Sequence, residues 1–179
     1  SIDKATSDNV VASVGGLGAL QVSRADATVS SRTEAFAGAL SGDIAQNVTT
    51  QINVGSGDID ITADGDMTAD AHIGGGGFGG LLNVTTYKPK ATVDGATRAY
   101  VRDGVGVNAA TLDINAGESS DRVTYLAKAN ADAVSISLGG GVADLEAEAE
   151  VTGVVEAFIG ASKDTTGGGN PLEIGRAHV

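Results

Sequence analysis

The sequence contains no cysteine and no tryptophan, and aromatic residues make up only 3% of its 179 residues. The absence of cysteine excludes disulfides, thiol catalysis and cysteine-ligated zinc. The scarcity of aromatic rings excludes a bulky globular core, because large side chains usually fill one. What the sequence has instead is 27 Gly and 28 Ala. Together with many Val and Ile residues, these small side chains predict thin, stacked β-structure.

Basic residues are also scarce, since 11 Lys and Arg stand against 23 Asp and Glu, which gives a net charge of −12. Such a chain repels phosphate backbones and anionic lipid surfaces, so we expect no nucleic-acid partner and no membrane insertion. No apolar run approaches the roughly 18 residues of a membrane-spanning helix. A hydrophobic content of 41% nevertheless excludes a disordered chain.

A long internal repeat organises the chain, with three units near residues 12–38, 71–101 and 136–160. Each unit contains an apolar strand, a Gly tract, an alternating strand, a turn and a short strand with one aromatic residue. Matching the Gly tracts aligns Val14 with Ile73 at a spacing of 59 and Ile73 with Leu138 at 65. The later landmarks align at spacings of 64 and 58, in the two series Val29, Val93, Val151 and Phe36, Tyr100, Phe158.

Strands are favoured over helices because apolar and polar residues alternate with a period of two. The segments 58–63 and 112–116 both alternate in this way and match each other at a spacing of 53. The segment 145–150 is rich in helix formers, but its repeat partners carry Thr-Val pairs. We therefore expect a strand there too.

Short alternating strands, Gly-rich turns and a long repeat predict an all-β fold, a parallel β-helix over residues 1–164. With rungs of roughly 20 residues, the chain would form about eight rungs and a rod roughly 40 Å long. The alternative is a β-sandwich with Gly-rich loops. Residues 165–172 are expected to form a flexible Gly-rich tail.

The two ends suggest a fragment of a longer protein. The chain begins at Ser1 without Met, and residues 173–179 fit nothing before them. That last segment resembles the translation of a short-read sequencing adapter, so we interpret it as a cloning or sequencing scar.

The series apolar-Gly-Gly, Thr-Val, Arg-Ala-Tyr-Val and Leu-Asp-Ile-Asn-Ala resembles the long repeats of leukotoxin-type filamentous adhesins, over about residues 9–163. These are large haemagglutinin-like bacterial exoproteins with right-handed parallel β-helices. The resemblance implies an autotransporter-like protein, secreted or held at the cell surface after export by a dedicated outer-membrane route. Residues 85–90 depart from the pattern and read as an insertion in the second unit.

Candidate sites for chemistry are few. His72 is the only histidine before the scar, and a lone histidine is more often a packing or surface residue than a catalytic one. The carboxylates of Asp58, Asp60, Asp64 and Asp66 could bind Ca²⁺, although solvated outward positions are the simpler interpretation. The segment 74–80 lacks the Lys of a phosphate loop and reads as a Gly-rich coil turn. We expect no catalytic residue, no cofactor and no metal.

The recurring aromatic residues are the best candidates for contact with a partner. If alternate residues of each short strand point inward, the aromatic ring points outward beside charged residues. Such rings could contact a protein or glycan, or could be covered by a loop or the next rung. The candidate contact residues are Phe36, Tyr100, Phe158, Arg98 and Arg102.

These observations predict a structural stalk segment of a bacterial surface or secreted adhesin, without catalysis of its own. Its partners would be flanking repeats of the same chain and, through the parent adhesin, a host glycan or protein receptor. The alternatives are a carbohydrate-active β-helix enzyme and a Ca²⁺-stabilised repeat module.

Overall fold

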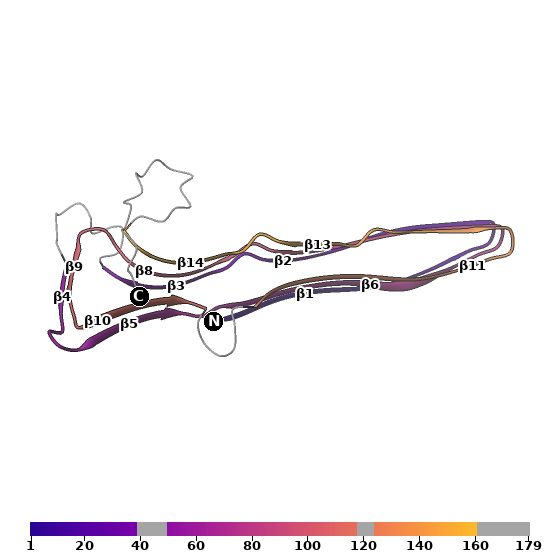
Figure 1. Cartoon of the computed structure of the whole chain (residues 1–179). Helices are drawn as coiled ribbons and strands as arrows, with labels where there is room; N and C mark the ends of the chain where they lie inside the picture. The colour runs from indigo at the N-terminus through magenta and orange to yellow at the C-terminus, as the bar shows by residue number, and fades with distance from the viewer. Residues whose placement is uncertain (39–49, 118–123, 161–179) are drawn as a thin grey trace.

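The computed structural model describes residues 1–38, 50–117 and 124–160, in which every regular element is a β-strand. The chain winds through three flattened coils that lie on one another (Figure 1). The first coil contains β1 (Ile2–Gly15), β2 (Gly18–Val29), β3 (Arg32–Ala37), β4 (Thr50–Asn53) and β5 (Asp58–Ala63). The second contains β6 (Asp66–Gly79), β7 (Leu82–Val93), β8 (Ala96–Val101), β9 (Val105–Asn108) and β10 (Thr111–Ala116). The third contains β11 (Tyr125–Ser137), β12 (Gly141–Leu145), β13 (Glu148–Val151) and β14 (Val154–Ile159).

All strand pairs are parallel and join one coil to the next. β6 lies between β1 and β11, β7 between β2 and the pair β12 and β13, and β8 between β3 and β14. The pairs β4–β9 and β5–β10 close the other end of the coil. This is the predicted all-β parallel β-helix, and the β-sandwich alternative is wrong because sandwich sheets pair antiparallel strands.

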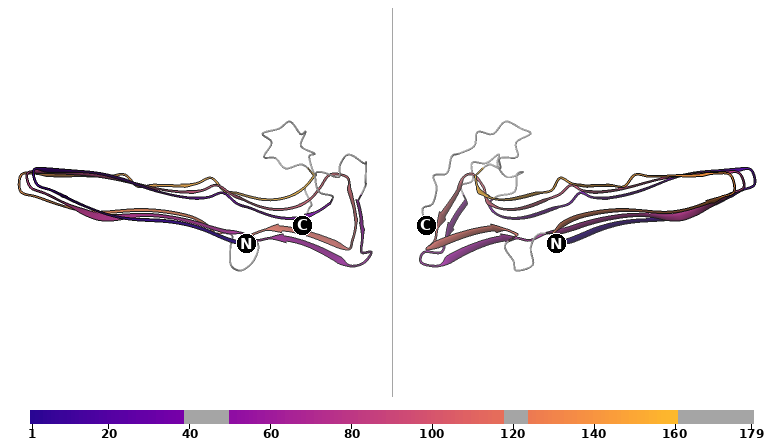
Figure 2. Two further views of the ribbon diagram at one scale, coloured as in Figure 1. Left: turned by 180° about the vertical axis from the view of Figure 1, so that it is seen from behind. Right: turned by 45° about the vertical axis from the view of Figure 1, so that its right-hand side comes forward.

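One repeat forms one coil, so the predicted rungs of about 20 residues are wrong. Ile2 pairs with Asp66, 64 residues on, and Met67 pairs with Tyr125, 58 residues on. The alternation of apolar and polar residues predicts strands. It does not say how many strands the chain forms before it pairs with its own previous coil. The first coil uses five strands, two of them 14 and 12 residues long. Three coils at about 4.8 Å give a thin slab rather than a 40 Å rod of eight rungs, as two further views confirm (Figure 2).

The alignment of the Gly tracts is also wrong, whereas the other landmarks are confirmed. Val14 pairs with Phe78, and Ile73 pairs with Asn9. The predicted spacings of 59 and 65 differ from the true 64 and 58 by odd numbers of residues. Because side chains of a strand alternate between its two faces, an odd error aligns a residue that points inward with one that points outward. The segment 85–90 is not an insertion, because β2 and β7 pair residue for residue from Gly18–Leu82 to Val29–Val93.

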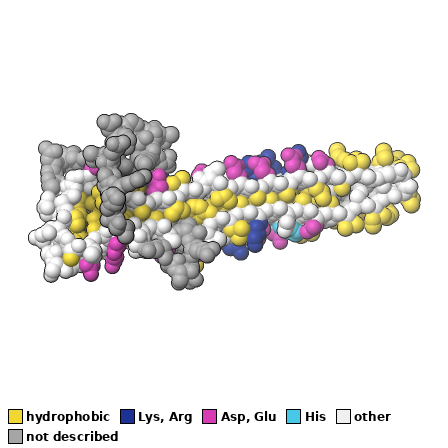
Figure 3. Space-filling model, in the orientation of Figure 1, with side chains coloured by type: hydrophobic (Ala, Val, Ile, Leu, Met, Phe, Trp, Pro, Cys, Tyr) yellow, Lys and Arg dark blue, Asp and Glu magenta, His cyan; other side chains and the backbone are white. Residues whose placement is uncertain are grey.

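Each coil has two long arms, one in the sheet of β1, β6 and β11 and the other in the sheet of β2, β7, β12 and β13. The core lies between these arms and is made mostly of small side chains. Its centre is a cluster that includes Met67, Ala69, Ala71 and Val93, all with 0% exposure. Figure 3 shows the inward apolar side chains as a stripe between the arms, which stops before the right-hand end of the slab. Because the arms are close together, Ala and Gly fill most of the space that bulky residues fill in globular proteins.

The Gly tract of residues 74–77 lies inside β6 and does not form the predicted turn. A Cβ on Gly75 would lie 2.7 Å from the hydroxyl of Tyr87, and a Cβ on Gly77 would lie 2.5 Å from Asn83 Nδ2. These glycines therefore make room for larger residues of the facing arm.

The segment 145–150 is strand, as expected, with a break at residues 146 and 147. Glu146 donates its N–H to the Tyr87 carbonyl at 3.0 Å, but the next donor in β7 would be Pro89, which has no N–H. The missing hydrogen bond explains why β12 and β13 are separate strands.

Candidate functional site: the ladders across β3, β8 and β14

The three recurring aromatic residues form a column across the coils. Phe36 and Phe158 pair in register with Tyr100, one from each side. The rings of Phe36 and Tyr100 lie 5.4 Å apart with an interplanar angle of 15°, and those of Tyr100 and Phe158 lie 4.8 Å apart at 3°. The spacing of the coils is close to the distance at which aromatic rings stack, so equivalent positions on successive coils bring the rings together.

Burial differs among the five candidate contact residues. Tyr100 is 7% exposed and Arg98 is 9% exposed. Phe36, Phe158 and Arg102 are half-buried. Neighbouring coils cover both faces of the Tyr100 ring and one face each of Phe36 and Phe158, which was the alternative that the sequence left open.

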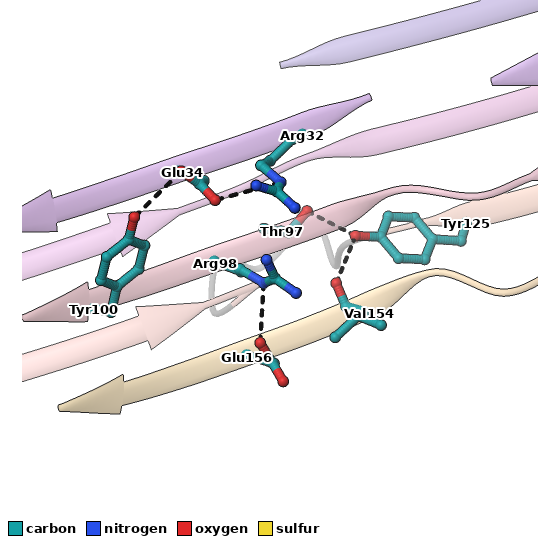
Figure 4. Close-up of polar contacts among 8 residues, drawn as sticks. All are labelled: Arg32, Glu34, Thr97, Arg98, Tyr100, Tyr125, Val154 and Glu156. Atoms are coloured by element: carbon teal, nitrogen blue, oxygen red, sulfur yellow. Dashed lines mark hydrogen bonds and ion pairs between the residues drawn. The ribbon is translucent and has the colours of Figure 1, made fainter. Parts of the chain in front are cut away.

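Charged residues form a second ladder beside the rings (Figure 4). Arg98 pairs in register with Glu34 on one side and with Glu156 on the other. Its Nε lies 2.9 Å from Glu156 Oε2, and both side chains are largely buried. Tyr100 donates its hydroxyl to Glu34 at 3.3 Å, which links the polar ladder to the aromatic column.

Two further cations lie beside this ladder, Arg32 on the same strand as Glu34 and Arg102 on the second coil. The Arg32 Nε lies 3.4 Å from Glu34 Oε1. The Arg102 guanidinium lies over the ring of Phe36, 4.8 Å from its centre, and 5.8 Å from that of Tyr100. Cations over ring faces are stabilising, so Arg102 reinforces the column at its edge.

The sequence analysis missed a ladder of lysines on the second coil and glutamates on the third. Lys88 contacts Glu146 at 2.5 Å, and Lys90 contacts Glu148 at 2.7 Å. The hydrogen bond to Glu146 raises the pKa of Lys88 and lowers the pKa of Glu146, and Glu148 similarly raises the pKa of Lys90. The signal was present, because each lysine is followed 58 residues later by a glutamate, the spacing of the aromatic landmarks.

Tyr125 is another residue that the sequence analysis missed. Its hydroxyl lies 2.9 Å from Thr97 Oγ1 and 3.2 Å from the Val154 carbonyl (Figure 4). The ring reaches across the slab from β11 toward β8 and β14, so it ties the two arms together beside the charged ladder.

His72 lies on the outer face of β6 between two carboxylates. Its Nδ1 lies 3.0 Å from Asp8 Oδ1, and its Nε2 lies 3.2 Å from Asp132 Oδ2. Hydrogen bonds to Asp8 and then to Asp132 raise the pKa of His72, because both ring nitrogens can donate only when the imidazole is protonated. The imidazole therefore links three successive coils as a clamp, since Asp8 lies in β1, His72 in β6 and Asp132 in β11.

The four aspartates considered for Ca²⁺ do not gather into one site. Asp58 accepts a hydrogen bond from Thr111 at 2.6 Å, and Asp66 accepts one from the Thr124 N–H at 2.9 Å. Asp60 pairs in register with Asp113, and Asp64 has a buried Oδ1 without a partner. Within residues 1–38, 50–117 and 124–160, no group of three or more His, Asp or Glu residues could hold a metal ion.

The predicted tail and scar, residues 165–179, lie outside the described residues. No helix in the described part of the chain is long and apolar enough to cross a membrane. No protein-family model, no curated protein and no solved structure matches this chain.

Proposed function

We propose that the chain is a structural segment of a bacterial surface or secreted adhesin, a stiff stalk that holds binding regions away from the cell. The observation that carries the proposal is the repetition of contacts from coil to coil. Aromatic rings stack on rings, and cations pair with carboxylates, at equivalent positions of successive coils. Such nearest-neighbour contacts let a solenoid extend without a change in its cross-section.

The edges of the slab support the same role. Among the described strands, β1 and β11 each pair only with β6, so each leaves one edge free. An unpaired strand edge accepts another parallel strand. Flanking coils of the same kind would fill these edges and lengthen the stalk.

The enzyme alternative gains no support from the aromatic residues. Carbohydrate-active sites use open ring faces to bind sugars, whereas both faces of Tyr100 are covered by Phe36 and Phe158. His72 is held by Asp8 and Asp132 on both ring nitrogens. We therefore place the receptor-binding and any catalytic role elsewhere in the parent protein.

Tandem duplication tests the stalk directly. A gene encoding residues 1–122 followed by residues 1–160 adds two complete coils before the original three, and should give a particle of unchanged cross-section and greater stack height in small-angle X-ray scattering. Two independent slabs joined by a linker would contradict the proposal.

Binding and cleavage assays test whether the chain itself binds a receptor or acts on a polysaccharide. Beads coated with the chain should adhere to a glycan array and to host cells no better than beads coated with an unrelated protein of equal charge. Incubation with polysaccharides should release no new reducing ends. Saturable glycan binding or polysaccharide cleavage would contradict a purely structural role.

A further inference from the structure

One end of the slab is uncharged over all three coils. The segments 9–23, 73–87 and 133–143 contain no Asp, Glu, Lys, Arg or His, although 19% of the chain is charged. They lie in register around the turns that join β1 to β2, β6 to β7 and β11 to β12. We call these three segments the distal tip, which is the end opposite β4 and β9 in Figure 1.

Large apolar side chains of the distal tip point into solvent. Val14 is 85% exposed and Leu138 is 90% exposed. Figure 3 shows apolar side chains on both outer faces at this end of the slab, where the charged side chains stop. Twelve such residues are between 53% and 90% exposed: Val10, Val14, Leu17, Leu20, Val22, Phe78, Leu81, Leu82, Val134, Ile136, Leu138 and Val142.

The polarity of the strands is inverted at the tip without any change of register. Along β2, Ala25 and Ala27 are buried and Arg24 is exposed, but farther out Gln21 is buried and Leu20 and Val22 are exposed. Pairing with β7 is continuous over this whole stretch. The inversion is therefore a property of the sequence on a regular strand.

Hydrogen bonds join part of the polar interior of the tip, where four buried polar atoms have no partner: Gln21 Nε2, Asn83 Oδ1, Thr85 Oγ1 and the Tyr87 hydroxyl. Asn9 donates to Ser23 at 2.8 Å, and Ser13 donates to Gln21 at 3.2 Å, in both cases from β1 to β2. Asn83 of the second coil donates to Ser135 of the third coil at 3.0 Å. This network fixes the arms with their polar residues inside, so the apolar residues stay outside.

Further coils cannot cover these apolar faces, because they would stack on the strand edges. For the chain by itself, a lipid layer is a poor cover, because the free edges of β1 and β11 would lose water and each unpaired group would cost several kcal/mol. A second slab packed against an outer face leaves those edges in water. Two copies with a net charge of −12 repel each other least where both lack charge.

The exposed area is sufficient for such a contact on each face. Burial of roughly 80 Å² per large apolar side chain gives about 1,000 Å² for the twelve residues, or about 500 Å² per face. A standard interface buries about 800 Å² per partner and weak, transient contacts bury less, so each face suffices for a weak self-association. We infer that the distal tip is a lateral association surface that binds a second copy of this chain on each of its two outer faces, sheet against sheet.

Sedimentation of the purified chain against concentration tests the inference. The wild type should form dimers and larger species, because each copy offers two faces. Val14→Ser with Phe78→Ser and Ile136→Ser removes one face and should stop association at the dimer. Adding Leu20→Ser, Leu82→Ser and Val142→Ser should leave monomers, with the dissociation constant raised at least about 30-fold.

Matched controls carry three substitutions on the outward side of the charged half, Thr6→Ser, Thr68→Ser and Thr92→Ser, and should associate like the wild type. Circular dichroism and melting confirm that each variant folds. Because the surface is uncharged, association of the wild type should persist in 1 M NaCl. This measurement uses the wild type alone, so it does not depend on whether a variant folds. A monomeric wild type at 100 µM, association that survives all six substitutions, or a monomer that floats with phosphatidylcholine vesicles through these residues would each overturn the inference.

Discussion

The two halves of the long arms follow opposite rules. In the half next to β3 and β8, Met67 and Ala69 are buried, and charged residues such as Lys88 and Lys90 cover the outside. In the distal tip the interior holds Asn and Ser side chains, and the outside holds Val, Leu and Phe. The same strands run through both halves. A regular parallel β-helix therefore does not need an apolar interior everywhere, and hydrogen bonds between the arms join part of the polar interior here.

The largest expected difference comes from adding a charge to each half. Met67→Asp buries an unpaired carboxylate in the core and should lower the free energy of unfolding by about 4 kcal/mol or more. Phe78→Asp, on the outer face of the tip, should change it by less than about 0.5 kcal/mol. Urea unfolding at low protein concentration measures both. Equal losses would show that the tip faces inward after all.

Removing the central ring of the aromatic column should have the next largest effect. Tyr100→Ala deletes a buried ring stacked on both faces and should cost about 3–5 kcal/mol in urea unfolding. Phe158→Ala removes one stacking partner and should cost less. A double-mutant cycle between the two positions should return a coupling of about 0.5–1.5 kcal/mol. Additive losses would mean that the rings do not interact.

A methyl group added inside the tip should cost less than the loss of the ring. Gly75→Ala forces a Cβ toward the Tyr87 hydroxyl and the Val11 carbonyl and should destabilise by about 1–3 kcal/mol. Gly16→Ala is the matched control in the tip, because nothing lies within 4 Å of its Cβ. Thermal unfolding compares the two variants, and a neutral Gly75→Ala would show that the arms are farther apart than described.

The clamp on His72 should have the smallest effect, since His72, Asp8 and Asp132 are all solvent-exposed to a substantial degree. Its pKa is raised above the ordinary 6.5, so its contribution to stability is complete below about that pH. The contribution is lost as the pH rises through the raised pKa. Asp70 and Lys128 lie close by on the same face and pair in register with each other.

The difference between the wild type and His72→Gln, measured by melting from pH 5 to pH 9, isolates the clamp from the other titrating groups. The wild type should lose its advantage over the variant toward high pH. A difference that does not change with pH would show that folding does not raise the pKa of His72.

The sequence predicted the strands and the fold class because alternation and turn chemistry are local signals. It also placed Phe36, Tyr100 and Phe158 at equivalent positions, and the structure confirms that spacing. It could not predict the length of a coil, because that depends on how many strands pass before the chain returns to itself. It misplaced Val14 and Ile73 because matching apolar residues assumes that all of them face the core, which fails at the tip.

The sequence alone could not predict that neighbouring coils cover the faces of the aromatic rings. Exposure of Tyr100 depends on the register between coils, and a ring with an outward position looks exposed until its stacked neighbours are known. The lysine–glutamate ladder, by contrast, could have been found from the 58-residue spacing alone.

The register at the tip gives the most direct test of the account. Because the chain has no cysteine, any disulfide must join the two introduced residues. With Val14→Cys and Phe78→Cys in one chain, the two residues pair in register on the outer face and should form an intramolecular disulfide under mild oxidation. With Val14→Cys and Ile73→Cys, the alignment of the Gly tracts, no such disulfide should form, because Ile73 is buried on the other face of its sheet. Mass spectrometry of peptides from the monomer distinguishes the two results. A disulfide in the second variant but not in the first would contradict both the coil length and the inverted polarity of the tip.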